Sequence, residues 1–188
     1  MNMENDKVII VGAFHETVEL CELCGKQIVG IIDGCTQETF MGYPILGTDV
    51  DASSICTRYL ECGIVISPDS SRVKRKLSQI YRDAGFSFAS LISPKATISR
   101  TASIGEGVVI QSGVNVSSSA VIGDFCKLNF NCNVMHDVVI GDYSILAPNA
   151  VILGRAKIGS DTYIGANSTV LTDTNVPDAT NVKPCSIL

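Results

Sequence analysis

The chain of 188 residues lacks several features that mark common classes of protein. It contains no apolar run of about eighteen residues, the length that crosses a membrane. Asp and Glu outnumber Lys and Arg, and the net charge of −5 disfavours nonspecific binding to nucleic acid or to an anionic membrane. Met1 to Asp6 are too polar and acidic for a signal peptide. We therefore expect a cytoplasmic protein that binds neither nucleic acid nor a membrane.

The second half of the chain carries a six-residue repeat without interruption. Every sixth residue from Ile92 to Val182 is Ile, Leu or Val, and the residue four positions later is small or β-branched. This period differs from the 3.6 residues of a helix and the 2 of a strand, and it is typical of a β-helix. Three repeats would form one triangular coil, so residues eighteen apart in the sequence should stack on successive coils.

Turn-forming pairs separate the repeats and predict the corners of the coils. They include Gly123-Asp124, Gly141-Asp142, Pro148-Asn149 and Gly159-Ser160. Residues 170–178 allow two interpretations, because they can form two more repeats or a tail that leaves the prism.

A metal site is not expected, although the chain contains eight cysteines. Cys21 and Cys24 form a single C-x-x-C pair within a helical stretch, and no second pair stands at zinc-ligand spacing. Cys126 and Cys132 occupy the small inward position of neighbouring repeats, where a free cysteine acts as an apolar filler.

Residues 7 to 91 alternate between apolar runs and helical stretches. The predicted strands are 7–11, 27–33 and 63–67, the predicted helices are 15–24, 49–60 and 69–84, and 42–47 is interpreted as a turn-rich connector. This order indicates a parallel sheet with helical crossovers. We therefore predict an α/β domain over residues 1–90 and a parallel β-helix over residues 91–188.

In such a sheet, ligands bind at the carboxyl ends of the strands. The residues expected there are Gly12, Ala13, Phe14, His15, Asp33, Gly34, Ser67 and Pro68. Asp33 could accept hydrogen bonds from a nucleobase or a ribose, and His15 could meet a phosphate at the start of its helix. The loop at Gly12 is not a G-x-G-x-x-G motif, so an ordinary helix start at His15 and an ordinary turn at Asp33 are the alternatives.

His136 is the only histidine of the repeats, and it lies outside the inward apolar set, directly before Asp137. A histidine with an acidic neighbour can act as a general base, because the carboxylate orients the ring and favours its protonated form. Eighteen residues later, Gly154 could supply a backbone N–H to an oxyanion. The alternative from the residues alone is a surface His-Asp pair on a turn.

The six-residue repeats resemble the left-handed β-helix of hexapeptide-repeat acyltransferases. More narrowly, nearly the whole chain resembles the sugar acetyltransferases of the NeuD and PglD type. The segments that carry this resemblance are Gly12-Ala13-Phe14-His15, Ile31-Ile32-Asp33-Gly34, residues 42–47 and residues 133–142, which include His136-Asp137. The resemblance implies a left-handed β-helix and a Rossmann-like domain over residues 1–90.

For function, the resemblance implies transfer of an acetyl group from acetyl-CoA to a sugar, most often the amino group of a nucleotide-linked amino sugar. His136 would match the catalytic base, Asp137 the residue that raises its basicity, and Gly154 the glycine whose N–H contacts the thioester carbonyl. The nucleotide sugar would be held by Ala13, Phe14, His15, Asp33, Gly34 and Ser67. Acetyl-CoA would lie between adjacent rods of a homotrimer, at Ile145, Gly154, Ala166 and Pro184, with no metal.

Three other functions are alternatives to a sugar N-acetyltransferase. A sugar O-acetyltransferase of the same fold and a non-catalytic nucleotide-sugar-binding scaffold are both compatible with the residues. A carbonic anhydrase on the same rod would need three histidine ligands for zinc, and the repeats contain only His136.

Outward-facing residues of the repeats predict the homotrimer independently of the resemblance. Val109, Val121, Val139, Ile145 and Val151 are too apolar for a free surface. Three rods related by cyclic symmetry would cover them.

Overall fold

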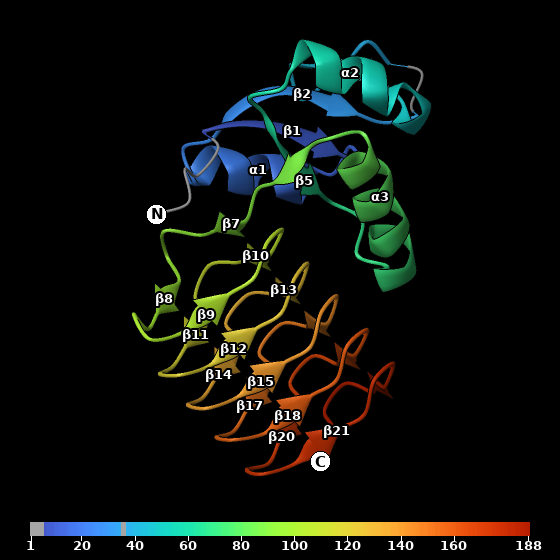
Figure 1. Ribbon diagram of the computed structural model, residues 1–188. Coiled ribbons are helices and arrows are strands. Elements are labelled where there is room, and N and C mark those ends of the chain that lie inside the picture. Colours follow the sequence, from blue (N-terminus) through green and yellow to red (C-terminus); the bar gives the residue numbers. More distant parts are fainter. Residues whose placement is uncertain (1–5, 35–36) are drawn as a thin grey trace. The chain divides into compact units, whose positions relative to one another are not determined.

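The computed structural model describes residues 6–34 and 37–188, which form two compact units, Met1–Leu91 and Ile92–Leu188 (Figure 1). Residues 1–5, part of the segment that argued against a signal peptide, lie outside the described residues. None of the described helices has both the length and the apolar character that a membrane span requires.

The first unit contains a mixed sheet whose described strands follow the order β3-β4-β2-β1-β5-β6. The strands are β1 (Lys7–Val11), β2 (Gln27–Ile32), β3 (Thr39–Phe40), β4 (Tyr43–Gly47), β5 (Gly63–Ile66) and β6 (Ser87–Phe88). The helical segments are α1 (His15–Leu23), the 3-10 turn η1 (Asp49–Asp51), α2 (Ala52–Arg58) and α3 (Ser71–Asp83). All strand pairs are parallel except β3 with β4, and the apolar run of β1 is buried because β1 lies between β2 and β5.

The connector predicted over residues 42–47 is wrong, because β4 is a strand of the sheet. It pairs in parallel with β2 and antiparallel with β3, so the segment from Thr39 to Gly47 adds a hairpin to the sheet. Leu46 packs on Gly30 of β2, where a β-carbon would lie 2.6 Å from the Leu46 Cγ. Tertiary packing therefore outweighed the turn signals of Gly42 and Pro44.

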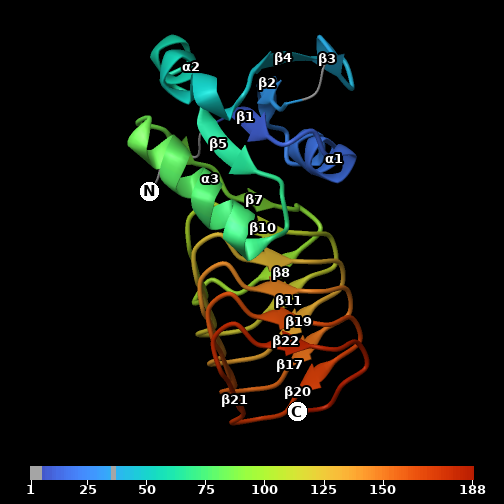
Figure 2. The same cartoon turned by 90° about the vertical axis from the view of Figure 1, so that its right-hand side faces the viewer.

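The second unit is a prism of stacked coils in which each coil contributes one short strand to each of three parallel sheets (Figures 1 and 2). One face contains β7 (Leu91–Ile92), β10 (Val109–Ile110), β13 (Lys127–Leu128), β16 (Ile145–Leu146), β19 (Tyr163–Ile164) and β22 (Asn181–Val182). The next contains β8 (Thr97–Ile98), β11 (Asn115–Val116), β14 (Asn133–Val134), β17 (Val151–Ile152) and β20 (Thr169–Val170). The third contains β9 (Ser103–Ile104), β12 (Val121–Ile122), β15 (Val139–Ile140), β18 (Lys157–Ile158) and β21 (Asn175–Val176).

The eighteen-residue register predicted from the sequence is confirmed. Asn133 pairs with Val151 and then Val151 with Thr169, and the other faces follow the same offset. The aliphatic residue of each repeat lies in one continuous core along the prism. Cys126 and Cys132 are fully buried in it, and burial raises the pKa of the Cys132 thiol to about 11. These features fit the left-handed β-helix that the resemblance implies.

The corners lie one residue later than three of the four predicted pairs. The turn after β12 is formed by Asp124 and Phe125, and Phe125 has a φ of +57° in the left-handed region. Gly123 precedes this turn, and the next coil passes too close to it for a side chain. A β-carbon there would lie 2.8 Å from the backbone N of Asp142. Pro148-Asn149 is a turn as predicted, with Asn149 at a φ of +61°.

Residues 170–178 form two further repeats, and the alternative of a departing tail is wrong. Val170, Val176 and Val182 are buried in the core, and β20, β21 and β22 pair with the preceding coil. A bridge between Thr169 and Ile187 extends the pairing nearly to the last residue.

Candidate active site

His136 and Asp137 lie at the corner that follows β14. The imidazole Nδ1 and the Asp137 Oδ2 are 2.8 Å apart, and the two side chains are 45% and 54% exposed. Asp137 has a φ of +59°, a conformation that aspartate tolerates better than most residues. When Nδ1 donates its hydrogen to the carboxylate, the lone pair of the neutral ring lies on Nε2. The pair can therefore present Nε2 as a proton acceptor.

Gly154 follows β17 at the equivalent position one coil later, and the imidazole lies against it. A β-carbon on Gly154 would be 2.8 Å from both Cε1 and Nε2 of His136. Any side chain there would push the ring away, so this glycine is required by the close approach of the histidine.

The N–H of Gly154 makes no hydrogen bond with any residue that the structure describes, although the residue is buried. On the corner that follows the β12 face, the equivalent N–H groups donate to the carboxylate of the next coil, as Asp124 N does to Asp142 Oδ1 at 2.9 Å. The same holds for Ser160 N and Asp178 Oδ1 at 2.7 Å. An unpaired N–H beside Nε2 is a suitable donor to an oxyanion that forms there.

Arg155 and Asp173 form an ion pair on the same corner that the sequence analysis missed. Arg155 donates from Nε to Asp173 Oδ1 at 2.8 Å and from Nη2 to Oδ2 at 2.9 Å. These hydrogen bonds hold the pKa of the Asp173 carboxyl below its ordinary value. Arg155 and Asp173 lie eighteen and thirty-six residues after Asp137. The eighteen-residue register therefore predicts that all three lie in line on one corner.

The residues predicted to contact the cofactor divide between a face and a corner of the prism. Ile145 lies on β16 and is only 8% exposed within the single chain. The prediction that a partner chain must cover it is therefore wrong, because other parts of the same chain cover it. Ala166 and Pro184 are stacked on the corner that follows this face, where Cys185 N donates to Ala166 O at 2.9 Å.

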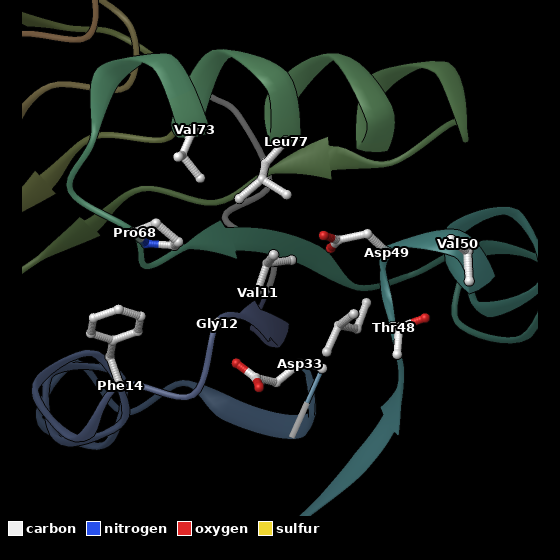
Figure 3. A pocket seen from close by; sticks show the side chains of 12 residues that line it. Val11, Gly12, Phe14, Asp33, Thr48, Asp49, Val50, Pro68, Val73 and Leu77 are labelled. Carbon is white, nitrogen blue, oxygen red and sulfur yellow. The ribbon is translucent and has the colours of Figure 1, made fainter. Parts of the chain in front are cut away.

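The first unit has a pocket of about 380 Å³ at the carboxyl ends of its central strands (Figure 3). Five of the predicted residues line it: Gly12, Phe14, Asp33, Gly34 and Pro68. The sequence analysis missed seven lining residues, from the ends of β1 and β2, the segment after β4 and one side of α3: Val11, Ile32, Thr48, Asp49, Val50, Val73 and Leu77. Recognising β4 as a strand would have pointed to Thr48 and Asp49.

Three predicted residues of this unit do not line the pocket. Ala13 donates its backbone N–H to Asp33 Oδ2 at 2.8 Å, so Asp33 holds the loop between β1 and α1. The ring of His15 packs edge-on against Phe40, with 4.7 Å between the ring centres. Ser67 is 7% exposed, and its hydroxyl has no hydrogen-bond partner among the described residues.

In residues 6–34 and 37–188, no three His, Cys, Asp or Glu side chains gather where they could hold a metal ion.

The chain is similar to several known transferases. Residues 119–154 match the family model described as bacterial transferase hexapeptide (six repeats). A comparison with curated proteins gives no match. Among solved structures, the chain is similar to a histidine-to-alanine variant of GDP-perosamine N-acetyltransferase from Caulobacter crescentus in complex with CoA and GDP-perosamine. The identity is 25% and the TM-score 0.90, over 97% of this chain and 88% of that chain.

Two further structures extend the comparison. The acetyltransferase domain of PglB from Neisseria gonorrhoeae in complex with acetyl coenzyme A is 25% identical, with a TM-score of 0.90 over 98% of this chain and 91% of that chain. WeeI from Acinetobacter baumannii is 25% identical, with a TM-score of 0.76 over 95% and 94% of the two chains.

The fold and the matched structures show an acyltransferase, and its repeats are similar to those of the hexapeptide-repeat transferases. Within that class, the predicted resemblance to the sugar acetyltransferases of the NeuD and PglD type is confirmed.

Proposed function

We propose that the protein transfers the acetyl group of acetyl-CoA to the amino group of a nucleotide-linked amino sugar, with His136 as the general base. The observation that carries this proposal is the arrangement of Nε2 of His136 beside the unpaired N–H of Gly154. The relatives solved with CoA, acetyl-CoA and GDP-perosamine support the two substrates.

In this reaction His136 accepts a proton from the acceptor amine as its nitrogen attacks the thioester carbonyl. The carbonyl oxygen becomes an oxyanion, which the N–H of Gly154 stabilises. The carbon–sulfur bond then breaks, and the proton held by His136 passes to the leaving CoA thiolate. Asp137 stabilises the imidazolium that exists between these two transfers.

Acetyl-CoA binding is assigned to the second unit, at Ile145, Gly154, Ala166 and Pro184, where Gly154 would meet the thioester. Ala166 and Pro184 form a continuous backbone edge along one corner, which suits an extended ligand. The assignment of these residues follows from the resemblance and from their positions on the prism.

Nucleotide-sugar binding is assigned to the first unit as a Rossmann-like domain. The pocket between Phe14, Asp33 and Asp49 is large enough for a nucleoside, and none of the described residues that line it is Lys, Arg or His. The phosphates would therefore lie outside it, toward the start of α1, where Ala13 and His15 stand. Ser67 donates its backbone N–H to the carbonyl oxygen of Val11 at 2.9 Å, at the start of the loop between β1 and α1.

The test is acetyl transfer itself, followed as thiol release from acetyl-CoA with a panel of UDP- and GDP-linked amino sugars. A product acetylated on nitrogen supports the proposal. Acetylation of a hydroxyl on a sugar without an amine would identify an O-acetyltransferase instead. Binding of nucleotide sugars without thiol release would identify a non-catalytic scaffold.

Asp33→Ala should raise the KM for the acceptor about tenfold and leave the KM for acetyl-CoA nearly unchanged. The reason is that Asp33 both lines the pocket and holds the N–H of Ala13, while acetyl-CoA is assigned to the other unit. Steady-state kinetics with each substrate varied in turn measure both constants. If both KM values rose together, or if neither rose, the assignment of the two substrates to different units would be contradicted.

A homotrimer of three 20.0 kDa chains is expected at micromolar concentration. Val121 and Val139 are neighbours on the β12 face and remain 42% and 40% exposed, which favours a partner that covers them. Light scattering on the wild type and on Val139→Glu tests the interface, because a buried carboxylate should dissociate the assembly. A wild type that is monomeric would exclude a cofactor site shared between chains.

A further inference from the structure

The corner that carries the catalytic pair also carries a line of alternating charges. Asp137, Arg155 and Asp173 occupy the same turn position on three successive coils, and their φ angles are +59°, +61° and +61°. The register of β14, β17 and β20 places them eighteen residues apart. Arg155 therefore has one carboxylate on the coil before it and one on the coil after it.

Arg155 is fixed close to the catalytic pair by its own backbone. Its N–H donates to the carbonyl oxygen of His136 at 3.0 Å, and the N–H of Asp173 donates to the carbonyl oxygen of Gly154 at 3.2 Å. The guanidinium donates from both Nε and Nη2 to the carboxylate of Asp173. Asp137 is bonded instead to His136 Nδ1 at 2.8 Å.

The pairing of Arg155 with Asp173 and that of His136 with Asp137 are coupled. An arginine between two carboxylates can form a bidentate ion pair with either of them. If the guanidinium turned to Asp137, it would compete with Nδ1 of His136 for the same carboxylate. In the structure, the guanidinium is instead held by the two oxygens of Asp173. The charge of Asp137 is then available to orient the imidazole.

We propose that Asp173 is a positioning residue that keeps Arg155 away from Asp137 and thereby preserves the bond between Asp137 and His136. This inference rests on the proposed function of His136. It extends the site by one coil beyond Gly154, into the repeats at the end of the chain.

The test compares Asp173→Asn, Arg155→Gln and the double variant in the transfer assay. Asp173→Asn should lower kcat about tenfold with little change in either KM, because the released guanidinium pairs with Asp137. Adding Arg155→Gln should restore most of the lost kcat, because the competitor is gone. Asp161→Asn is the control, since Asp161 has the same turn conformation, with a φ of +57°, on another corner.

Rescue separates this role from a structural one. If Asp173 only stabilised the turn, the double variant would be at least as slow as Asp173→Asn, and that result would overturn the proposal. A wild-type kcat in Asp173→Asn would overturn it as well. Thermal unfolding of each variant identifies any loss of kcat that follows from misfolding.

Nitrogen NMR of the two histidines tests the same inference without any transfer reaction. In the wild type, neutral His136 should carry its hydrogen on Nδ1, facing Asp137. Asp173→Asn should shift the ring toward a mixture of tautomers, and Arg155→Gln should reverse the shift. An unchanged tautomer in Asp173→Asn would overturn the inference even if the protein transfers no acetyl group to any acceptor tried.

Discussion

Purified His136→Ala is expected to fold normally and to lose most acetyl transfer, with kcat lowered about 10²–10⁴-fold, the usual contribution of a general base. The fold should persist because the side chain is 45% exposed and lies outside the buried core of the prism. The measurement is single-turnover transfer at saturating acetyl-CoA. Because the amine must then lose its proton to water, the remaining rate should rise with pH.

Arg100→Ala is the matched control, because Arg100 occupies the same position of the repeat two coils earlier. It should stay within about threefold of the wild type. Transfer within about tenfold of the wild type in His136→Ala would reject the assignment of the general base.

Gly154→Ala should reduce kcat about a hundredfold, although it adds a single methyl group. The new β-carbon would lie 2.8 Å from Cε1 and Nε2 of His136, so the imidazole must move away from the N–H of Gly154. The backbone needs no rearrangement, since Gly154 is not among the glycines with a positive φ. Thermal unfolding should therefore change much less than transfer.

The double variant with His136→Ala shows whether the methyl group acts through the ring. In the absence of the imidazole, Gly154→Ala should cost only a few-fold, because nothing is left to displace. Equal losses in both backgrounds would mean that Gly154 contributes independently of His136.

Much of the second unit could be predicted from the sequence, because a β-helix converts sequence distance into spatial distance. The aliphatic period locates the core, and the offset of eighteen places Gly154 beside His136 from the sequence alone. Three of the four predicted corners lie one residue early, because Gly123, Gly141 and Gly159 precede the turns and make room for the next coil.

The first unit could be predicted less completely, because its contacts are not periodic. The strands β1, β2 and β5 were visible as apolar runs, but β4 contains Pro44 and Gly47 and is only partly buried. Without β4, the sequence could not show that Thr48 and Asp49 line the same pocket as Asp33. The position of Asp33 at a strand end predicts a ligand-binding residue. No sequence pattern predicts that its carboxylate accepts a hydrogen bond from the N–H of Ala13.

By itself, the sequence determined the period, the inward residues, the stacking register and the candidate base, since each depends on residue type at fixed spacing. Only the tertiary structure decided which polar groups pair and which stay unpaired. Among the residues that the structure describes, the N–H of Gly154 has no partner, Arg155 pairs with Asp173, and Ile145 is covered. The physical reason is that the register fixes which residues are neighbours, while side-chain rotamers and packing decide between equivalent neighbours.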